Sequence, residues 1–255
     1  MLTRYHDGES TARAFELLPA IDLLGGRVVR LERGDFARET AFSEDPVATA
    51  LAFADAGARW LHVVDLDAAR DGSSEHGGVI GRIVEAVGER VAVELAGGLR
   101  TERAVGDALR RGAARAVVGT AALREPAFAA RLVERHGSER IAVALDVRAG
   151  DAVGHGWVPG TRGVAAVQAL LALADAGVRT FEVTAIERDG MLAGPDLELY
   201  RRLVAVGRGS IIASAGVAST DDLRALRELG CSGAIVGRAL YDGRLTLQAA
   251  LRAFE

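Results

Sequence analysis

Short runs of Val, Ile, Leu and Ala recur along the chain and alternate with longer stretches whose apolar residues have helical spacing. The short runs are continuous rather than alternating, which is typical of parallel strands buried on both faces. They predict eight strands, over residues 16–21, 60–65, 91–96, 115–118, 141–145, 180–184, 210–214 and 233–236. The longer stretches between them predict helices.

The ends of the expected helices carry recognisable signals. Asp45 before a proline, Thr101 and Ser219 each precede a helical pattern and predict N-caps. Ser219 also has capping-box spacing to Asp222. At the opposite ends, four glycines follow Ala- or Leu-rich stretches, where a left-handed residue is needed. They are Gly57, Gly112, Gly177 and Gly230.

Eight strands that alternate with eight helices predict a parallel sheet, and 255 residues suit its closure into one barrel. The predicted fold class is therefore α/β, a (β/α)8 TIM barrel. No G-x-G-x-x-G follows the first strand, so nothing favours an open dinucleotide-binding sheet. We expect residues 1–15 to be a flexible polar extension and residues 16–255 to form a single barrel domain.

The chain repeats itself at almost half its length, which indicates two (βα)4 half-barrels rather than a solenoid. The repeat pairs Asp22 with Asp146, Asp71 with Asp189, Gly97 with Gly216, Thr101 with Thr220, and Gly119 with Gly237. The separation is 124 residues for the first pair and 118 or 119 for the others.

Composition removes several kinds of chemistry. The chain has neither Lys nor Asn, and all 31 basic residues are Arg. The missing lysine excludes a Schiff-base enzyme, a P-loop and a protein-kinase site. The missing asparagine excludes N-glycosylation. The single Cys231 cannot form an internal disulfide, and no pair of histidines has helical metal-ligand spacing, so we predict neither a metal nor a cofactor.

The remaining composition is that of an ordinary globular protein, with 49% hydrophobic residues, 26% charged residues and a net charge of -4. The slight acidity argues against nucleic acid and anionic membranes as partners. No apolar run approaches the length of a membrane-spanning helix. We expect a cytoplasmic monomer whose partner is a small molecule.

In a barrel of this kind the reactive groups lie at the carboxyl ends of the strands. Asp22 and Asp146 follow the first and fifth strands, and the half-barrel repeat places them on opposite sides of the mouth. Thr184 ends the sixth strand, and Asp189 lies in the loop after it. Two carboxyl groups that face each other suit general acid and base roles. Asp65 is as readily interpreted as a helix cap.

Small residues follow four of the strands and let backbone N–H groups approach a phosphate. One set, the first cradle, comprises Gly97, Gly98, Gly119 and Thr120. The other, the second cradle, comprises Ser214, Ala215, Gly216, Gly237 and Arg238 and follows the last two strands, a frequent phosphate site in barrels. Two cradles on opposite sides predict a substrate with a phosphate at each end.

Three other side chains are candidates for contacts. Arg30 can reach a substrate phosphate or carboxylate, although most arginines are simply solvated. Trp157 lies in the loop after the fifth strand and is either a stacking residue over the mouth or an anchor of its loop. His62 lies within an apolar strand, which favours a hydrogen-bonded core histidine over a ligand.

These residues occur within ordered motifs that cover nearly everything after Glu16. They are PAIDLLGGRVVRL (19–31), LHVVDLDAARDG (61–72), VELAGGLRT (93–101), VVGTAAL (117–123), VALDVRAG (143–150), VTAIERDGMLAGPDLELY (183–200) and GAIVGRALYDG (233–243). Together they resemble the ProFAR isomerase family of histidine biosynthesis, the phosphoribosylformimino-5-aminoimidazole carboxamide ribotide isomerases. The resemblance implies a cofactor-free Amadori rearrangement of a bis-phosphorylated ribotide, from an aminoaldose to an aminoketose.

The resemblance also implies roles for single residues. Asp22 matches the general base that removes the C2 proton, and Asp146 matches the opposite carboxylate, often assigned as the acid. Asp189 matches a further candidate acid that helps to open the ribose ring. Arg30 and Trp157 match positions that contact the substrate, and Thr184 matches a polar residue beside it. Gly190 completes the Asp-Gly pair that begins with Asp189.

The chain departs from the family pattern at several positions, and alternatives follow from them. Ala185 stands where an acidic residue is usual and His155 where an arginine is usual in the branch that also isomerises phosphoribosylanthranilate in tryptophan synthesis. Both changes argue against that dual-substrate alternative. Ala96, Ala215 and Asp196 alter the two S-G-G turns and a G-P-N turn, which leaves a non-catalytic phosphosugar-binding barrel as another alternative. The related cyclase subunit usually opens with C-L-D-V, whereas this chain has AIDL.

Overall fold

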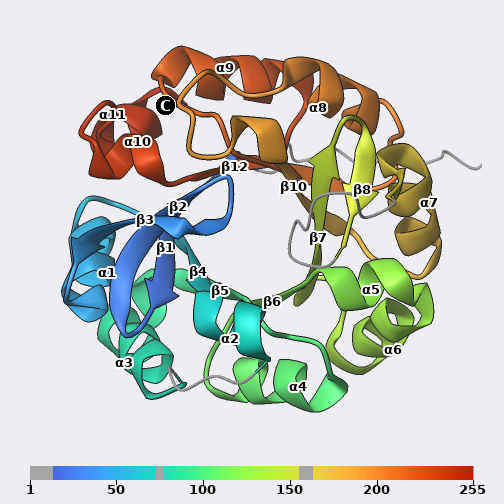
Figure 1. Cartoon of the computed structure of the whole chain (residues 1–255), viewed down its shortest axis with the longest axis horizontal. Helices are drawn as coiled ribbons and strands as arrows, with labels where there is room; N and C mark the ends of the chain where they lie inside the picture. Colours follow the sequence, from blue (N-terminus) through green and yellow to red (C-terminus); the bar gives the residue numbers. More distant parts are fainter. Residues whose placement is uncertain (1–13, 73–76, 155–162, 255) are drawn as a thin grey trace, which may run out of the picture.

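The computed structural model describes residues 14–72, 77–154 and 163–254, in which a ring of parallel strands is surrounded by helices (Figure 1). Neighbouring strands of the ring pair in parallel, and the pairing of β7 with β10 closes it. The ring consists of β1 (Glu16–Leu24), β4 (Trp60–Asp65), β5 (Ala92–Ala96), β6 (Arg115–Val118), β7 (Ile141–Arg148), β10 (Thr180–Ala185), β11 (Ser210–Ser214) and β12 (Gly233–Val236). The predicted (β/α)8 barrel is confirmed, and each expected strand coincides with one of these to within three residues.

A helix follows each strand of the ring on its outer side. These helices are α1 (Pro46–Asp55), α3 (Gly77–Val87), α4 (Glu102–Arg110), α6 (Pro126–His136), α7 (Ala166–Asp175), α8 (Leu197–Val204), α9 (Thr220–Leu229) and α11 (Leu247–Arg252). Short helical segments occur as well: α2 (Leu66–Asp71), η1 (Gly88–Arg90), α5 (Thr120–Arg124), η3 (Ile186–Arg188) and α10 (Arg238–Tyr241). Within the described ranges, no helix combines the length and apolar character that crossing a membrane requires.

The predicted helix caps are present. The Asp45 side chain accepts hydrogen bonds from the first turn of α1, Thr101 caps α4, and Ser219 forms a reciprocal capping box with Asp222 on α9. The four glycines expected after helices all have left-handed backbones, with φ between 95° and 100°. Local signals in the sequence therefore determine where these helices begin and end.

The hairpin between β1 and α1 was not predicted. It consists of β2 (Arg27–Glu32), which pairs with both β1 and β3 (Asp35–Ser43). Arg33 and Gly34 at its turn both have positive φ, 51° and 71°, as a two-residue hairpin turn requires. A smaller arm, β8 (Asp151–Val153) and β9 (Val164–Ala165), follows β7. Both arms extend ring strands that end in candidate catalytic carboxylates.

The buried residues form two cores because successive strand residues point to opposite faces of the ring. The outward residues, such as Leu61, Val143 and Phe181, join the helices in one large apolar layer. The inward residues Leu18, Ala20, Ile212 and Ile235 form a small separate cluster with Trp60. The prediction of strands buried on both faces is confirmed. The continuous apolar runs nevertheless conceal buried polar residues at inward positions: His62, Glu94, Arg115 and Glu182.

The structure corrects the register of the half-barrel repeat. Gly97 and Gly98 have φ of 93° and 68°, and the residues with the same paired left-handed conformation are Ala215 and Gly216, at 85° and 84°. Gly97 therefore corresponds to Ala215, 118 residues on, and not to Gly216. Likewise the N-caps of α4 and α9 are Thr101 and Ser219, so Thr101 does not correspond to Thr220. A repeat of adjacent small residues aligns equally well in sequence at either offset, but only one offset matches the backbone.

The 124-residue offset of the two aspartates is confirmed by strand pairing. Asp22 lies opposite Val29 in the first arm, and Asp146 lies opposite Val153 in the second. Arg30 of the first arm therefore corresponds to Gly154 of the second. Each half-barrel thus projects an arm from the same place, but the two arms carry different residues there.

The first strand, β1, begins at Glu16. Of the extension expected over residues 1–15, only Ala14 and Phe15 are among the described residues. Phe15 stacks on Phe254, with 4.5 Å between the ring centroids, so the two ends of the described chain lie together.

The corrected register predicts opposite effects of two substitutions in equivalent turns. In Gly97→Ala the new Cβ would overlap the Asp65 carbonyl at a φ of 93°, which should lower the free energy of unfolding by about 2–5 kcal/mol. Ala215→Gly removes the strain of an alanine in the left-handed conformation. This should raise the free energy of unfolding by about 0.5–1 kcal/mol, after subtraction of the entropy that glycine adds to the unfolded chain. Urea unfolding of both variants measures these changes, and equal effects would contradict the assigned register.

Candidate active site

The candidate catalytic carboxylates lie at the mouth of the ring. Asp22 on β1 and Asp146 on β7 have three ring strands between them in either direction, so they come from opposite sides. Thr184 on β10 lies beside Asp146 in the parallel register. The neighbours of Asp22 and Asp146 along each strand pack in the outer layer, so both carboxylates face the lumen. The structure therefore brings these three predicted residues around one opening.

Arg30 pairs with Asp22 across the first arm. Its Nη1 donates to Asp22 Oδ2 at 2.9 Å, and only 13% and 14% of the two side chains are exposed. Burial disfavours the guanidinium, but the charges of Asp22 and Asp189 outweigh that effect and raise the pKa of Arg30. Its Nε is buried and has no hydrogen-bond partner among the described residues. Arg30 thus holds one carboxylate and also borders the pocket beside it.

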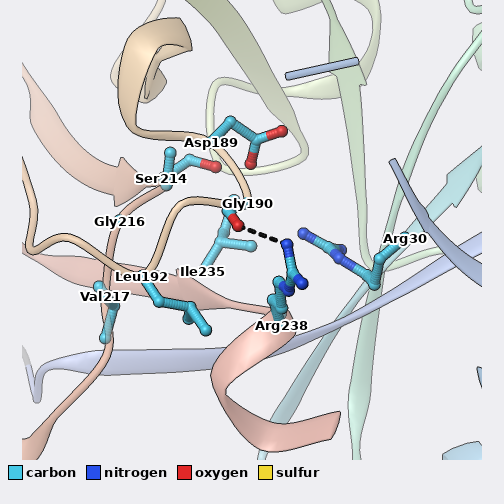
Figure 2. Close-up of a pocket in the computed structure, with 11 residues that line it drawn as sticks. Arg30, Asp189, Gly190, Leu192, Ser214, Gly216, Val217, Ile235 and Arg238 are labelled. Atoms are coloured by element: carbon cyan, nitrogen blue, oxygen red, sulfur yellow. Dashed lines mark hydrogen bonds between the residues drawn. The ribbon is translucent and has the colours of Figure 1, made fainter. Parts of the chain in front are cut away.

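A pocket of about 340 Å³ lies beside this ion pair and contains the second cradle. Figure 2 shows the guanidinium groups of Arg30 and Arg238 facing the same space, with Asp189 at its edge. Its lining consists of Arg30, Asp189, Gly190, Leu192, Ser214, Ala215, Gly216, Val217, Ile235, Gly237 and Arg238. All five predicted residues of the second cradle are present in it. Leu192, Val217 and Ile235 were missed, because a lone apolar residue after a strand carries no chemical signal.

The backbone of the second cradle is held from behind. The Tyr200 hydroxyl on α8 donates to the Ser214 carbonyl at 2.7 Å, and the Gly194 amide donates to the Gly216 carbonyl at 3.0 Å. A Cβ at Gly237 would overlap the Arg30 guanidinium. Glycine at that position therefore permits Arg30 to lie directly over the start of α10, which is a favourable place for an anion.

Arg238 connects the second cradle to the loop that carries Asp189. Its Nη1 donates to the Gly190 carbonyl at 2.8 Å, and its Nε contacts Asp242 at 3.1 Å. An anion in the pocket would therefore lie next to a side chain that also orders the Asp189–Gly190 segment.

Asp189 is suited to donate a proton. Burial raises the pKa of its carboxyl to about 6, the charges of Asp22 and Asp146 act in the same direction, and Arg30 opposes them. Asp22, by contrast, forms a direct ion pair with Arg30 at 2.9 Å. The two carboxyl groups at one mouth therefore have different surroundings, which is how acid and base roles are separated.

The first cradle reproduces the backbone of the second but not its charge. Gly119 and Gly237 cap α5 and α10 with φ of -111° and -115°. Thr120 begins α5 where Arg238 begins α10. Gly154, the counterpart of Arg30, lies so that a Cβ there would be 3.2 Å from the Thr120 side chain. Arg30 therefore lies over the second cradle, whereas a glycine without a side chain, Gly154, lies at the corresponding place beside the first.

The structure also places the remaining predicted residues. Trp157 and His155 lie outside the described residues. Asp65 caps α2 through its bond from the Ala68 amide, which confirms the cap interpretation. Asp196 caps α8 by accepting from the Leu199 amide at 3.0 Å, so aspartate serves this turn in place of the asparagine usual in the family. Ala185 is buried at the end of β10, with 2% of its surface exposed.

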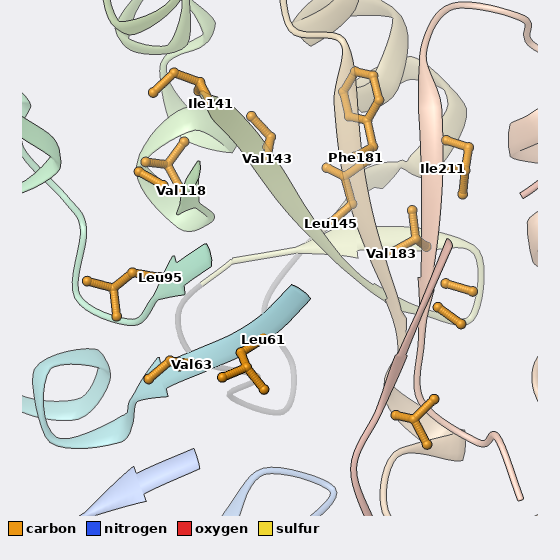
Figure 3. Packing of buried hydrophobic residues seen from close by; sticks show 14 of the residues in the cluster. Leu61, Val63, Leu95, Val118, Ile141, Val143, Leu145, Phe181, Val183 and Ile211 are labelled. Carbon is orange, nitrogen blue, oxygen red and sulfur yellow. The ribbon is translucent and has the colours of Figure 1, made fainter. Parts of the chain in front are cut away.

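A cluster of buried charges occupies the lumen below the mouth. Figure 3 shows Leu61 and Val63 in the apolar packing of the outer layer, and His62 between them faces inward. His62 Nδ1 lies 2.6 Å from Glu94 Oε1 and 3.6 Å from Glu182 Oε2. The interpretation of His62 as a hydrogen-bonded core histidine is confirmed.

This lumen cluster is also the group in which a metal ion would find ligands, since one ligand atom each from His62, Glu94 and Glu182 lie within 4.8 Å of one another. Both oxygens of Glu94 are already engaged, however, one by His62 and the other by Arg115 Nε at 2.7 Å. Burial and then the charge of Glu94 raise the pKa of Glu182 well above its ordinary value. A proton on Glu182 would relieve the repulsion between the two neighbouring carboxyl groups.

Comparison with known proteins agrees with this geometry. A model of the histidine biosynthesis protein family matches residues 16–246, which is nearly the whole barrel. The chain belongs to this family.

Relatives within the family share most of the chain. A protein of Thermomicrobium roseum is 49% identical over 235 residues, which cover 91% of this chain and 94% of its own. Proteins of Symbiobacterium thermophilum and Thermus thermophilus are 46% and 44% identical, each over 92% of this chain and at least 95% of their own. All three are named 1-(5-phosphoribosyl)-5-((5-phosphoribosylamino)methylideneamino)imidazole-4-carboxamide isomerase, abbreviated below as ProFAR isomerase.

The lumen cluster predicts an unusual dependence of stability on pH. The pKa of Glu182 is higher in the folded than in the unfolded chain, so its stabilising proton is fully held at acid pH and lost as pH rises through the folded pKa. Over that window this one group should lower the free energy of unfolding by about 1.4 kcal/mol per pH unit. In Glu182→Gln this component should vanish. Unfolding of both proteins across the pH range measures the difference, and parallel curves would show that Glu182 is ionised.

Proposed function

We propose that the chain is a ProFAR isomerase, which converts an aminoaldose ribotide into the aminoketose without a cofactor. The observation that carries the proposal is that two carboxyl groups in different surroundings lie beside one pocket lined by arginines. Asp22 is paired with Arg30, and burial raises the pKa of Asp189 to about 6. The names of the relatives agree with this chemistry.

Substrate binding relies on the two cradles. In the second cradle, one phosphate accepts hydrogen bonds from backbone N–H groups near Gly216 and Gly237. The same phosphate faces the guanidinium groups of Arg30 and Arg238. In the first, a second phosphate meets the corresponding amides of Gly97, Gly98 and Gly119. The ribose to be isomerised then lies between Asp22 and Asp146, which come from opposite sides of the ring.

The first chemical step opens the ribose ring. Asp189 gives its proton to the ring oxygen, the bond from that oxygen to C1 breaks, and the lone pair of the nitrogen on C1 forms a C1=N double bond. The resulting cation is stabilised by the carboxylate of Asp146 on the opposite side. Thr184 lies beside Asp146 and supplies a hydroxyl to the same region.

The second step moves the double bond. Asp22 removes the proton from C2, and the electrons of that C–H bond form C1=C2 while those of C1=N return to nitrogen. C1 then takes back the proton from Asp22, and the C2 hydroxyl gives its proton to Asp189 as the carbonyl forms. Both carboxyl groups end in their starting state, as a cofactor-free isomerisation requires.

The dual-substrate alternative receives no support from the described residues. Ala185 is buried and apolar at the position where an acidic residue is usual in the family, and His155, where that branch usually has arginine, lies outside the described residues. Turnover of ProFAR and of phosphoribosylanthranilate by the same preparation separates the two functions. We expect efficient turnover of the first only.

Removing the base should abolish the reaction. Asp22→Asn should lower kcat by about 10²–10⁴-fold, because proton abstraction from C2 then has no acceptor. Asp71→Asn is the matched control, since the half-barrel repeat relates Asp71 to Asp189 and yet Asp71 is half exposed and paired with Arg70. Its kcat should stay within about twofold of the wild type. Absence of turnover in the wild type would instead favour the non-catalytic phosphosugar-binding barrel.

The acid should appear in the pH profile. Asp189 acts only while protonated, so kcat/KM should fall as pH rises through about 6. A substrate phosphate titrates in the same range, near pH 6, and would give a similar limb. Arg30→Met distinguishes titration of Asp189 from titration of the substrate phosphate. Because the charge of Arg30 lowers the pKa of Asp189, its loss should move the fall of kcat/KM to higher pH, and the overall rate should also decrease. A limb that does not move would assign it to the substrate.

A further inference from the structure

Tyr241, at the end of α10, contacts two of the elements that supply the site, β1 and the first arm. Its helix begins with Arg238 of the second cradle. Its hydroxyl contacts β1, which carries Asp22, and its ring contacts the arm that carries Arg30. Tyr241 has no role in the proposed mechanism. It contacts β1 and the first arm without lining the pocket.

The hydroxyl contact is a single hydrogen bond to the strand of the base. Tyr241 donates to the Ala20 carbonyl at 2.8 Å, two residues before Asp22. Burial raises the pKa of the phenol, the charge of Asp22 adds to this, and Arg30 opposes it. The phenol therefore remains a donor at any working pH, and it lies close enough to the Asp22–Arg30 pair to feel both charges.

The ring contacts brace the first arm. Tyr241 packs on Phe42 of β3 with 5.0 Å between centroids and meets Phe53 of α1 edge-on at 5.9 Å. β3 pairs with β2, on which Arg30 lies. The same side chain thus fixes the strand of Asp22 by a hydrogen bond and the arm of Arg30 by aromatic packing.

We propose that Tyr241 is a positioning residue for the isomerisation, which holds Asp22 and Arg30 in register with the phosphate pocket at the start of α10. The inference rests on the proposed function. It differs from a purely structural role, in which the hydroxyl merely satisfies its hydrogen bond and its loss changes stability alone.

A second buried tyrosine supplies the matched comparison. The Tyr200 hydroxyl also meets strand-end carbonyls, that of Ser214 at 2.7 Å, which leads to the second cradle, and that of Val183 on β10 at 3.2 Å. Neither of these strands carries the base. Tyr241→Phe and Tyr200→Phe therefore each remove a phenol hydroxyl, but behind different parts of the site.

The experiment measures steady-state kinetics and hydrogen exchange of the full chain and both variants with ProFAR as substrate. Tyr241→Phe should lower kcat about tenfold with KM changed less than about twofold, because a small displacement of the base acts on the chemical step. Tyr200→Phe should mainly raise KM. Exchange should quicken over residues 16–32 in the first variant and over residues 210–217 in the second.

The outcomes separate the two proposals. An unchanged kcat in Tyr241→Phe, with only a lower melting temperature, overturns the positioning role while leaving the isomerase intact. Equal kinetic losses in the two variants overturn it as well. Absence of turnover in the wild type overturns the proposed function, and the exchange pattern then still decides whether Tyr241 holds β1 and the first arm.

A second variant keeps the test informative should Tyr241→Phe fail to fold. Phe42→Leu leaves the bond to Ala20 and removes the aromatic contact on the arm side. It should raise KM and lower kcat together, since Arg30 contacts both Asp22 and the phosphate pocket. Kinetics identical to the wild type would show that Tyr241 does not position the arm.

Discussion

Closure of eight parallel strands into a ring is the constraint on which the site depends. Every second residue of each strand must then enter a lumen that is narrow enough for residues from opposite strands to meet. At the last inward positions this places Asp22 opposite Asp146, and deeper in the lumen it places His62 of β4 within 3.6 Å of Glu182 on the opposite strand β10. An open sheet with the same strands would leave the two aspartates on separate edges. The chemistry at the mouth is thus a consequence of closure and of side-chain alternation.

Much of this architecture was predictable because it rests on local signals. Continuous apolar runs marked the ring strands, and Asp45, Thr101 and Ser219 marked helix starts that the structure confirms. The second cradle was predictable too, since small residues after the last two strands of a barrel form a recurrent phosphate site. The roles of single side chains remain predictions, which resemblance supports and geometry makes specific.

What the sequence did not reveal depends on groups brought together from distant segments. The first arm was missed because β3 is exposed and has no apolar run, although Arg33 and Gly34 marked its turn. The ion pair of Arg30 with Asp22 follows from that arm. The raised pKa of Asp189 requires the burial and the neighbouring charges that only the folded ring assembles. The register of the repeat was ambiguous because neighbouring small residues align at two offsets, and backbone φ values decide between them.

The half-barrels have diverged in function while keeping one backbone plan. Asp189 is half-buried beside Arg30, whereas its counterpart Asp71 is half exposed and bound to Arg70, whose hydrogen bond holds the pKa of that carboxyl below its ordinary value. Two cradles of the same shape would accept a ligand with two phosphates in either direction. The residues that overhang them are not the same, because Arg30 lies over Gly237 and Gly154 lies beside Thr120. A symmetric scaffold thereby gains polarity, and in the proposed isomerase this exchange of arginine for glycine would decide which end of the ligand meets the acid.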